Sequence, residues 1–356
     1  MRSFTSSFDR IKKIRLVPDQ RWGRVGLLVA ALTFAMLLGW EFTVRAMGYG
    51  TSINDTPGLW AMSRDELKRH PDSIVIIGSS RIRFGLDHGA VSEAFGGARV
   101  VNLSMNGSVA RPQLANLAND ESFTGLVICD HTPGLFWAPG GPNLAETMEW
   151  IDAYGKRTPS ERIGQALALG PESVFAFLNK DDLSLSPLLR RWIQIPNREG
   201  AQLPPRMPPY LAKVEIDRRE IMWEKLETDA DFQREVQEIW RVLFSFGGPL
   251  PPDLLAKLRG EVVADVQKIR ARGGDVIFVR FPSTGWLREF ENEVNPREVY
   301  WDPLLAETGS LGIHFEDYPE LSGYDCPEWS HLTAADALQF SKDLMRIVQE
   351  KRASRQ

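Results

Sequence analysis

The chain has 356 residues, of which 43% are hydrophobic and 25% are charged, and its net charge is −5. This length allows one large domain or two modest ones with a sizeable core. Residues 1–24 carry a net charge of about +5, so the remainder carries about −10. An acidic main body argues against nucleic acid as a partner, because phosphate binding needs clusters of basic residues.

The basic segment 1–24 precedes an apolar stretch over residues 25–45. About twenty helical residues span about 30 Å, the thickness of a bilayer core. Glu41 is the only charge within residues 25–44, and Trp22 and Trp40 stand where interfacial aromatics occur. We therefore expect a transmembrane helix over 25–45, with the N-terminus in the cytoplasm and the main domain outside it. A cleaved signal peptide is the alternative, since residues 44–46 form an acceptable cleavage site.

Five apolar runs predict strands that are buried on both faces, as in a parallel sheet. They cover residues 73–78, 99–105, 125–131, 275–282 and 312–318. An apolar stripe predicts a helix over 254–272, and a last helix is predicted over 333–351 with Thr333 as its cap. This alternation predicts an α/β domain over 55–352, built on a doubly wound, five-stranded parallel sheet of the flavodoxin-like kind.

A long segment, about residues 135–250, separates the third and fourth predicted strands and exceeds a plain crossover. Its charged stretch 214–243 predicts helix, so we expect a large helical insertion that forms a cap or a docking surface. The segment holds five tryptophans: Trp137, Trp150, Trp192, Trp223 and Trp240. They are expected either to form the core of a helical subdomain or to offer aromatic faces on which sugar rings stack.

The two cysteines, Cys129 and Cys326, allow one disulfide outside the cytoplasm. Cys129 lies in an apolar run, which favours a buried thiol instead. The chain has no zinc-spaced Cys/His pattern and no Walker phosphate loop. The sequence therefore predicts no metal and no cofactor.

A candidate nucleophile follows the first predicted strand, in Gly78-Ser79-Ser80. A serine hydroxyl needs a base to take its proton and a third group to orient that base. His331 precedes the last helix, and Glu328 stands three residues before it, where a carboxylate can hold the imidazole. Ser80 is therefore predicted as the nucleophile, with His331 as its base, although either serine hydroxyl can instead cap the following helix.

Other polar residues are predicted at the same sheet edge, because ligands bind beyond the carboxyl ends of parallel strands. The Gly107 backbone N–H follows the second strand and is a candidate oxyanion donor with the Ser80 N–H. Asn102 lies in the second predicted strand and Asp130 in the third, and both are candidate substrate contacts. Arg81 and Arg83 are candidate contacts to a sugar acid or an acyl carboxylate, or two charges on an exposed helix face.

These blocks resemble the SGNH (GDSL-like) hydrolase family. Its Gly-Asp-Ser block is matched by residues 78–80, where Ser79 replaces the aspartate, and its asparagine and glycine are matched by Asn102 and Gly107. Its Asp-x-x-His block is matched at 328–331 with glutamate in place of aspartate, and Asp325 is an alternative partner for the histidine. The Gly-x-Asn-Asp block is absent, and Thr132 falls where the oxyanion asparagine is expected. The resemblance covers about residues 55–155 and 253–352, without the insertion.

With its single N-terminal anchor, the chain is similar to the proteins of alginate O-acetylation and of teichoic acid D-alanine transfer. This resemblance implies a bacterial inner-membrane protein with a periplasmic domain. It also implies O-acyl transfer, of acetyl above all, onto an exported cell-envelope polysaccharide beside a multi-spanning membrane-bound O-acyltransferase. The alternatives are a carbohydrate esterase or deacetylase and a non-catalytic assembly partner of that transferase.

Overall fold

The computed structural model of the chain describes residues 20–192, 210–245 and 247–355. The side chains of residues 181, 182, 186 and 190–192, Trp192 among them, lie outside this description, as do residues 1–19 of the basic segment. The chain divides into two compact units, the first ending at Tyr49 and the second beginning at Gly50. Each unit is described by itself.

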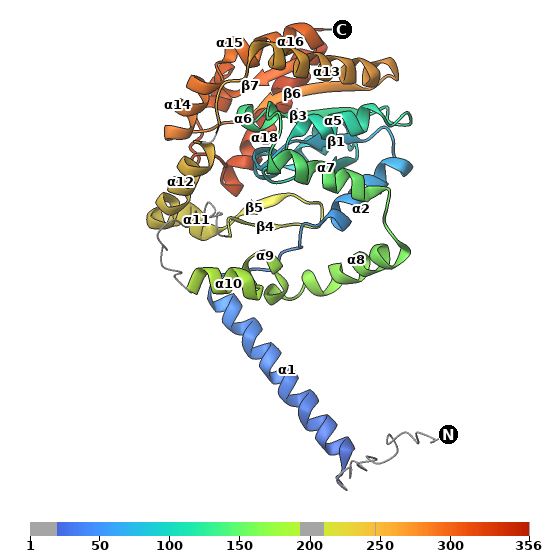
Figure 1. Ribbon diagram of the computed structural model, residues 1–356, viewed down its shortest axis with the longest axis vertical. Helices are drawn as coiled ribbons and strands as arrows, with labels where there is room; N and C mark the ends of the chain where they lie inside the picture. Colours follow the sequence, from blue (N-terminus) through green and yellow to red (C-terminus); the bar gives the residue numbers. More distant parts are fainter. Residues whose placement is uncertain (1–19, 193–209, 246, 356) are drawn as a thin grey trace, which may run out of the picture. The chain divides into compact units, whose positions relative to one another are not determined.

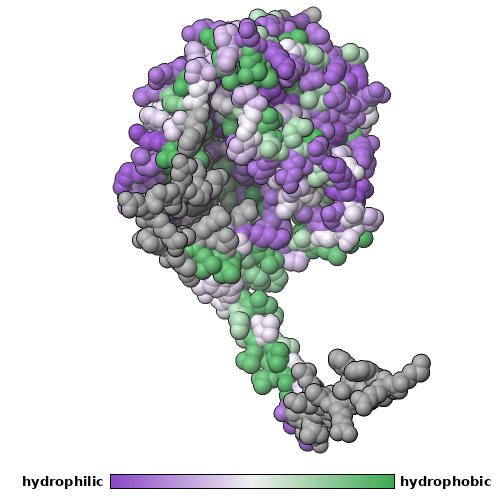
Figure 2. Space-filling model, in the orientation of Figure 1, coloured by the Kyte–Doolittle hydropathy of each residue, from purple (hydrophilic) through white to green (hydrophobic). Residues whose placement is uncertain are grey.

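The first unit contains one long apolar helix, α1 (Trp22–Ala46). It has 25 residues, and an 18-residue window within it has a mean hydropathy of 1.9, so the helix is long and apolar enough to cross a membrane. The only acidic residue of α1, Glu41, forms an ion pair with Arg45 one turn later, at 2.6 Å. Figure 2 shows the mainly hydrophobic surface of this helix. The helix is therefore compatible with a single-pass membrane protein.

The second unit is built on five parallel strands in the order β2-β1-β3-β6-β7 (Figure 1). The strands are β1 (Ile74–Ile77), β2 (Val100–Asn102), β3 (Leu126–Asp130), β6 (Asp275–Arg280) and β7 (Leu311–His314). Each of the five predicted strands is present, although the last ends early because residues 315–317 form a 3₁₀ turn, η3. The order is the doubly wound pattern in which strand order reverses beside β1.

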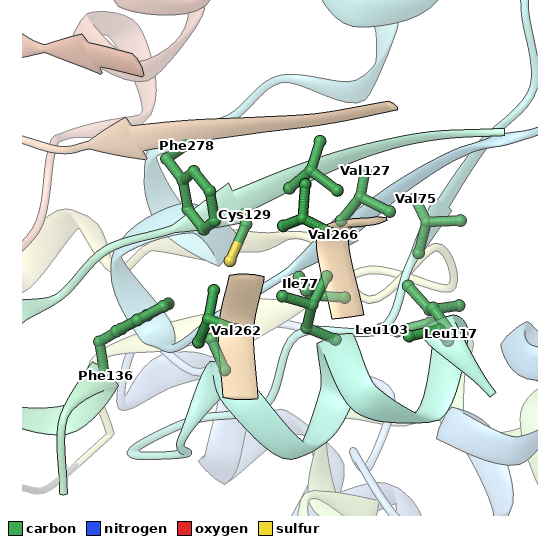
Figure 3. Packing of buried hydrophobic residues seen from close by; sticks show 14 of the residues in the cluster. Val75, Ile77, Leu103, Leu117, Val127, Cys129, Phe136, Val262, Val266 and Phe278 are labelled. Carbon is green, nitrogen blue, oxygen red and sulfur yellow. The ribbon is translucent and has the colours of Figure 1, made fainter. Parts of the chain in front are cut away.

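Helices cover both faces of the sheet, because successive strand residues point to opposite sides. Val75 and Ile77 face a cluster completed by α2 (Pro57–Arg69), α5 (Ala110–Ala118), α13 (Pro252–Ala271) and α16 (Asp302–Thr308) (Figure 3). Ile74 and Ile76 face a second cluster, with α3 (Ser80–Gly85), α4 (His88–Ala94) and α18 (Ala334–Ala353). The Thr333 hydroxyl caps α18 as predicted. Between β6 and α18 lie α14 (Gly285–Val294), α15 (Arg297–Tyr300) and α17 (Pro319–Ser322).

The segment between β3 and β6 is mostly helical in its described part. It contains α6 (Pro133–Phe136), α7 (Pro142–Tyr154), α8 (Pro159–Glu172), η2 (Ala176–Leu178), α9 (Lys180–Leu183), α10 (Leu185–Trp192), β4 (Ala212–Val214), β5 (Glu220–Met222), α11 (Glu224–Thr228) and α12 (Ala230–Phe244). The prediction of helix throughout 214–243 is wrong at its start, because β4 and β5 form an antiparallel hairpin there. A turn with Arg218 at φ 67° joins the two strands.

The four tryptophans of this segment whose side chains are described pack in hydrophobic clusters. Trp137 is buried in the first core cluster, and Trp150 packs against it. Trp223 and Trp240 pack against a smaller cluster that joins Phe84 of α3 to β5, α11 and α12. Of the two interpretations of these residues, the structure agrees with a packing role.

Candidate functional site

The turn after β1 requires glycine at position 78. Gly78 has φ +143°, and a Cβ there would lie 2.4 Å from the Cβ of Asp130. The chain then turns directly into α3, which begins at Ser80. Ser79 is the N-cap residue, but its hydroxyl makes no capping hydrogen bond. The close approach of β1 and β3 therefore sets Ser80 at the carboxyl edge of the sheet.

Ser80, His331 and Glu328 form one hydrogen-bonded chain. The Ser80 Oγ lies 2.8 Å from His331 Nε2, and His331 Nδ1 lies 2.8 Å from Glu328 Oε1. The same carboxylate oxygen accepts the His331 backbone N–H at 2.7 Å. Glu328 is fully buried, His331 is 2% exposed and Ser80 is half-buried. The arrangement can move a proton from the serine hydroxyl to an imidazole that the carboxylate orients.

Two aromatic rings hold the imidazole in place. Phe84 stacks on His331 with ring centroids 4.2 Å apart, and Trp240 of α12 meets it edge-on at 6.1 Å. The Trp240 indole N–H also donates a hydrogen bond to Glu328 Oε2. The segment between β3 and β6 thus contributes directly to the environment of the carboxylate.

The loop that carries Glu328 and His331 contains a strained residue. Trp329 has φ +75°, a left-handed conformation that costs a bulky residue about 1–2 kcal/mol. Its carbonyl accepts the Thr284 N–H at 3.0 Å, and the guanidinium of Arg241 lies 5.1 Å from its ring. Trp329 lies in the chain between Glu328 and His331, whose side chains are hydrogen-bonded to each other.

Asp325 does not take the place of Glu328. Its side chain is exposed, whereas the buried Glu328 carboxylate contacts His331 directly. Glutamate replaces the aspartate of the Asp-x-x-His pattern at the same spacing, and its carboxylate still reaches the imidazole. Asp325 is dropped as a candidate.

The Gly107 loop is fixed beside the nucleophile turn. The Gly78 carbonyl accepts the Met105 N–H at 3.0 Å and the Ser108 hydroxyl at 2.8 Å. Gly107 has φ +60°, and its carbonyl accepts a hydrogen bond from Asn143 of α7. Within the described part of the chain, the N–H groups of Ser80 and Gly107 donate to no other atom. These two groups are therefore available to an oxyanion.

Asp130 and Thr132 are hydrogen-bonded to Ser79. Asp130 Oδ2 accepts hydrogen bonds from the hydroxyls of Ser79 at 2.9 Å and Thr132 at 2.8 Å, and from the Ser79 N–H at 3.3 Å. Burial raises the pKa of Asp130, against the hydrogen bond from Thr132 and the nearby Arg81 charge, which lower it. Both side chains are buried, and Asp130 Oδ1, which has no hydrogen-bond partner among the described residues, is buried as well. We therefore drop Thr132 as an oxyanion donor and Asp130 as a substrate contact.

The arginines of α3 are inside the protein, so the prediction of an exposed charged face is wrong. Arg81 is 2% exposed and forms an ion pair with Glu291 at 2.6 Å, and Arg280 reaches the same carboxylate at 2.6 Å. Burial opposes ionisation of Glu291, but the two guanidiniums lower its pKa to about 2. Arg81 Nε also donates to the Ser330 hydroxyl at 3.2 Å, which ties α3 to the histidine loop. Arg81 is therefore a buried structural residue that connects α3 to Glu291 and to the histidine loop, and it is not a substrate contact.

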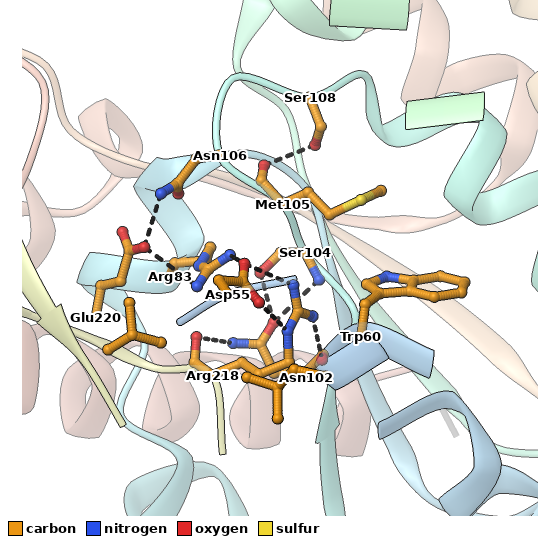
Figure 4. A network of polar contacts seen from close by, with 12 residues as sticks. Asp55, Trp60, Arg83, Asn102, Ser104, Met105, Asn106, Ser108, Arg218 and Glu220 are labelled. Atoms are coloured by element: carbon orange, nitrogen blue, oxygen red, sulfur yellow. Dashed lines mark hydrogen bonds and ion pairs between the residues drawn. The ribbon is translucent and has the colours of Figure 1, made fainter. Parts of the chain in front are cut away.

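Arg83 belongs to a second buried network (Figure 4). It pairs with Asp55 and, at 3.1 Å, with Glu220 of β5. Arg218 of the hairpin turn holds Asp55 at 2.8 Å and donates to the Asn102 carbonyl at 2.8 Å. Two acidic and two basic groups thus balance inside the protein.

The network of Figure 4 continues to the loop of the candidate site. Asn106 donates to Glu220 at 2.7 Å, one residue before Gly107. The Asn102 side chain is buried and bonds Ser104 and the Arg218 carbonyl. Arg83 and Asn102 therefore shape the loop from inside, and neither is a substrate contact.

Several supporting residues escaped the sequence analysis, namely Asp55, Phe84, Arg218, Glu220, Trp240 and Glu291. Asp55 lies 23 residues before Gly78, Phe84 lies four residues after Ser80, and the other four lie 37 or more residues from the motif blocks. Only Trp240 gave a signal, as an aromatic residue on an amphipathic helix. The remaining partners are set by tertiary packing, which a single sequence does not display.

Both cysteines are free and buried, Cys129 in the first core cluster and Cys326 in the second. Among the described residues, no group of His, Cys, Asp and Glu side chains could hold a metal ion. No protein-family model matches the chain, and no curated protein matches it significantly. The geometry of the site is therefore the main observation that bears on the chemistry of this protein.

Proposed function

We propose that this protein is a membrane-anchored serine acyltransferase with an SGNH-like site. The observation that carries the proposal is the continuous chain from Ser80 Oγ through His331 to the buried Glu328. The Ser80 N–H on this turn and the Gly107 N–H on the neighbouring loop are the proposed oxyanion donors, which complete the set of parts that acyl transfer needs.

The reaction proceeds by double displacement. His331 Nε2 takes the proton of Ser80 as Oγ attacks the carbonyl carbon of an acyl ester, and the oxyanion binds the N–H groups of Ser80 and Gly107. The imidazolium returns the proton to the leaving oxygen, which leaves an acyl ester on Ser80. An acceptor hydroxyl then gives its proton to His331 and attacks this ester, so the acyl group passes to the acceptor and Ser80 regains its proton.

The acceptor that we propose is a hydroxyl of an exported cell-envelope polysaccharide, and the acyl group is acetyl. This part of the proposal rests on the family resemblance and on α1, which is compatible with an anchor in the bacterial inner membrane. The partner would be a multi-spanning O-acyltransferase that delivers acyl groups across the membrane. With water as acceptor the same site would act as an esterase.

The first experiment asks which serine reacts. We expect a fluorophosphonate probe to label the purified full chain at Ser80, and Ser80→Ala to abolish labelling. Ser79→Ala is the matched control, since it removes the neighbouring hydroxyl and should retain labelling. Absence of labelling in folded wild-type protein, with its folding checked by near-UV circular dichroism, would favour a non-catalytic assembly role.

A second experiment separates transferase from esterase. The full chain is incubated with an activated acetyl ester and an oligosaccharide acceptor, and acetylated saccharide and free acetate are measured together. For a transferase, we expect saccharide to capture most of the acetyl group and to raise the rate of acyl-enzyme breakdown. Acetate as the sole product, at a rate independent of every acceptor, would identify an esterase.

A further inference from the structure

Helix α8 exposes two large apolar side chains. A surface helix ordinarily buries its apolar stripe and exposes its polar side. In α8, Ile163 and Leu167 lie four residues apart on one side and are 60% and 71% exposed. Two polar residues of the helix point inward instead. Gln165 accepts a hydrogen bond from the N-cap threonine of α2 at 2.8 Å, and Glu172 is 5% exposed and accepts a backbone N–H at 3.1 Å.

Exposed leucines continue along the next helices of the chain. In α10, Leu185 and Leu189 are 72% and 44% exposed. Figure 1 draws α8, α9 and α10 along the lower edge of the second unit, and Figure 2 shows hydrophobic residues at that edge. We call the surface formed by Ile163, Leu167, Leu185 and Leu189 the α8–α10 face.

The chain enters the second unit beside η2 and α9, the two short elements that connect α8 to α10. The Asn54 side chain donates to the Leu178 carbonyl at 3.0 Å and accepts the Lys180 N–H at 2.8 Å. Its backbone N–H donates to Glu172 on the inward side of α8. Asn54 follows the last residue of α1, Ala46, by eight residues, which extend to at most about 28 Å. The covalent link therefore keeps α1 within about 28 Å of the elements that carry the α8–α10 face.

We infer that the α8–α10 face is a membrane-binding surface, whose aliphatic side chains enter the headgroup–acyl boundary of the lipid bilayer. The inference rests on the proposed membrane anchoring by α1. Acyl chains require no matched shape, which suits a ridge of aliphatic side chains, and their removal from water is favourable. The tether raises the local concentration of lipid, so four apolar side chains suffice where a free protein would need more.

The test uses the full chain reconstituted in phosphatidylcholine vesicles that carry nitroxide-labelled acyl chains. An environment-sensitive fluorophore is attached at Leu167→Cys. The matched control is Leu338→Cys, a leucine of α18 that is 42% exposed. The native cysteines are 0% and 1% exposed and do not compete for the label. We expect blue-shifted emission at position 167 and quenching at least twofold stronger than at position 338.

Equal quenching at the two positions would overturn the inference, and would leave a protein partner as the occupant of the face. A label at Leu185→Cys, measured with and without Ile163→Ser and Leu167→Ser, guards against insertion driven by the dye. We expect the two serines to reduce quenching at 185, and unchanged quenching would contradict the inference. Fluorophosphonate labelling of Ser80 in the same vesicles keeps this result separate from the proposed chemistry.

Discussion

The Glu328 carboxylate accepts hydrogen bonds from two parts of the chain. One oxygen accepts from the backbone N–H and from Nδ1 of His331, and the other oxygen accepts from the indole N–H of Trp240. A fully buried carboxylate with this set of bonds fixes both the position and the tautomer of the imidazole. The proposed chemistry at Ser80 would therefore depend on a residue that is fully buried.

Glu328→Gln is expected to lower kcat/KM for ester hydrolysis by roughly 10²–10⁴-fold, because an amide holds the imidazole without the charge that stabilises imidazolium. The amide oxygen can still accept from His331, but the NH2 group then faces the Trp240 indole N–H, so the melting temperature should also fall and activity is compared well below it. Asp325→Asn removes an exposed carboxylate three residues earlier and is the matched control. Equal activity of both variants and wild type would show that His331 acts without its carboxylate.

Two buried histidines make stability depend on pH. Burial and the nearby Arg280 and Arg297 charges lower the pKa of His314 to about 3, and burial lowers the pKa of His131 well below 6.5. Between pH 3 and 6.5 the unfolded chain binds protons that the folded protein does not. The free energy of unfolding therefore falls as the pH decreases through this window, by up to about 1.4 kcal/mol per pH unit for each histidine.

His314→Asn should make the dependence of unfolding on pH shallower. The substitution removes the proton that the unfolded state gains but keeps an acceptor near the Glu316 N–H that Nδ1 now binds. Urea denaturation in mild detergent, followed by tryptophan fluorescence from pH 4 to 7, measures the slope. A slope identical to that of wild type would mean that His314 titrates normally in the folded protein.

At the scale of single residues, the candidate catalytic residues were easier to predict from the sequence than the buried residues that hold them in place. Ser80, Glu328 and His331 could be singled out because their chemistry and spacing are local signals. Arg81 and Arg83 could not be placed, since an arginine on a short helix looks the same whether its partner is water or Glu291. Burial of such a charge depends on a carboxylate far along the chain.

At the scale of elements, the β4–β5 hairpin links the beginning of the second unit, at Asp55, to α3 and to the Gly107 loop. Its turn residue Arg218 is fully buried and pairs with Asp55, and its Glu220 holds Asn106. Burial lowers the pKa of Arg218, and Asp55 opposes this shift. The hairpin is small, yet it controls the backbone that offers the Gly107 N–H.

Arg218→Met is expected to destabilise the protein by roughly 3–5 kcal/mol, because it leaves a buried charge without one of its partners. Urea denaturation measures the change. Arg234→Met is the control, since it removes an exposed ion pair on α12 and should cost less than about 1 kcal/mol. Similar effects of the two substitutions would mean that the network of Figure 4 contributes no more than a surface pair.

The parallel strands were predictable because their residues are apolar on both faces, as in Ile74–Ile77. The hairpin was not predictable, because its strands, Ala212–Val214 and Glu220–Met222, are only three residues long and each contains a charged residue. Charged residues at 215–219 continued the helical pattern of α12 upstream. The turn that breaks this pattern is specified by contacts of Arg218 with distant residues.

For the whole molecule, α1 makes the proposed location testable. We expect the full chain to remain in the membrane fraction after alkaline carbonate extraction, because a 25-residue apolar helix inserts with few charged positions. Leu28→Arg together with Leu32→Arg should release it to the soluble fraction. Release of wild-type protein would indicate a cleaved leader, and N-terminal sequencing of the product would locate the cut.

Ser80 and His331 are 251 residues apart, and the histidine arrives only 25 residues before the C-terminus. In the proposed mechanism, a chain made from its N-terminus therefore presents Ser80 long before the histidine that would take its proton. Until residues 328–331 have been made, the Ser80 hydroxyl lacks this partner. We therefore expect chains that terminate before His331 to leave Ser80 unreactive.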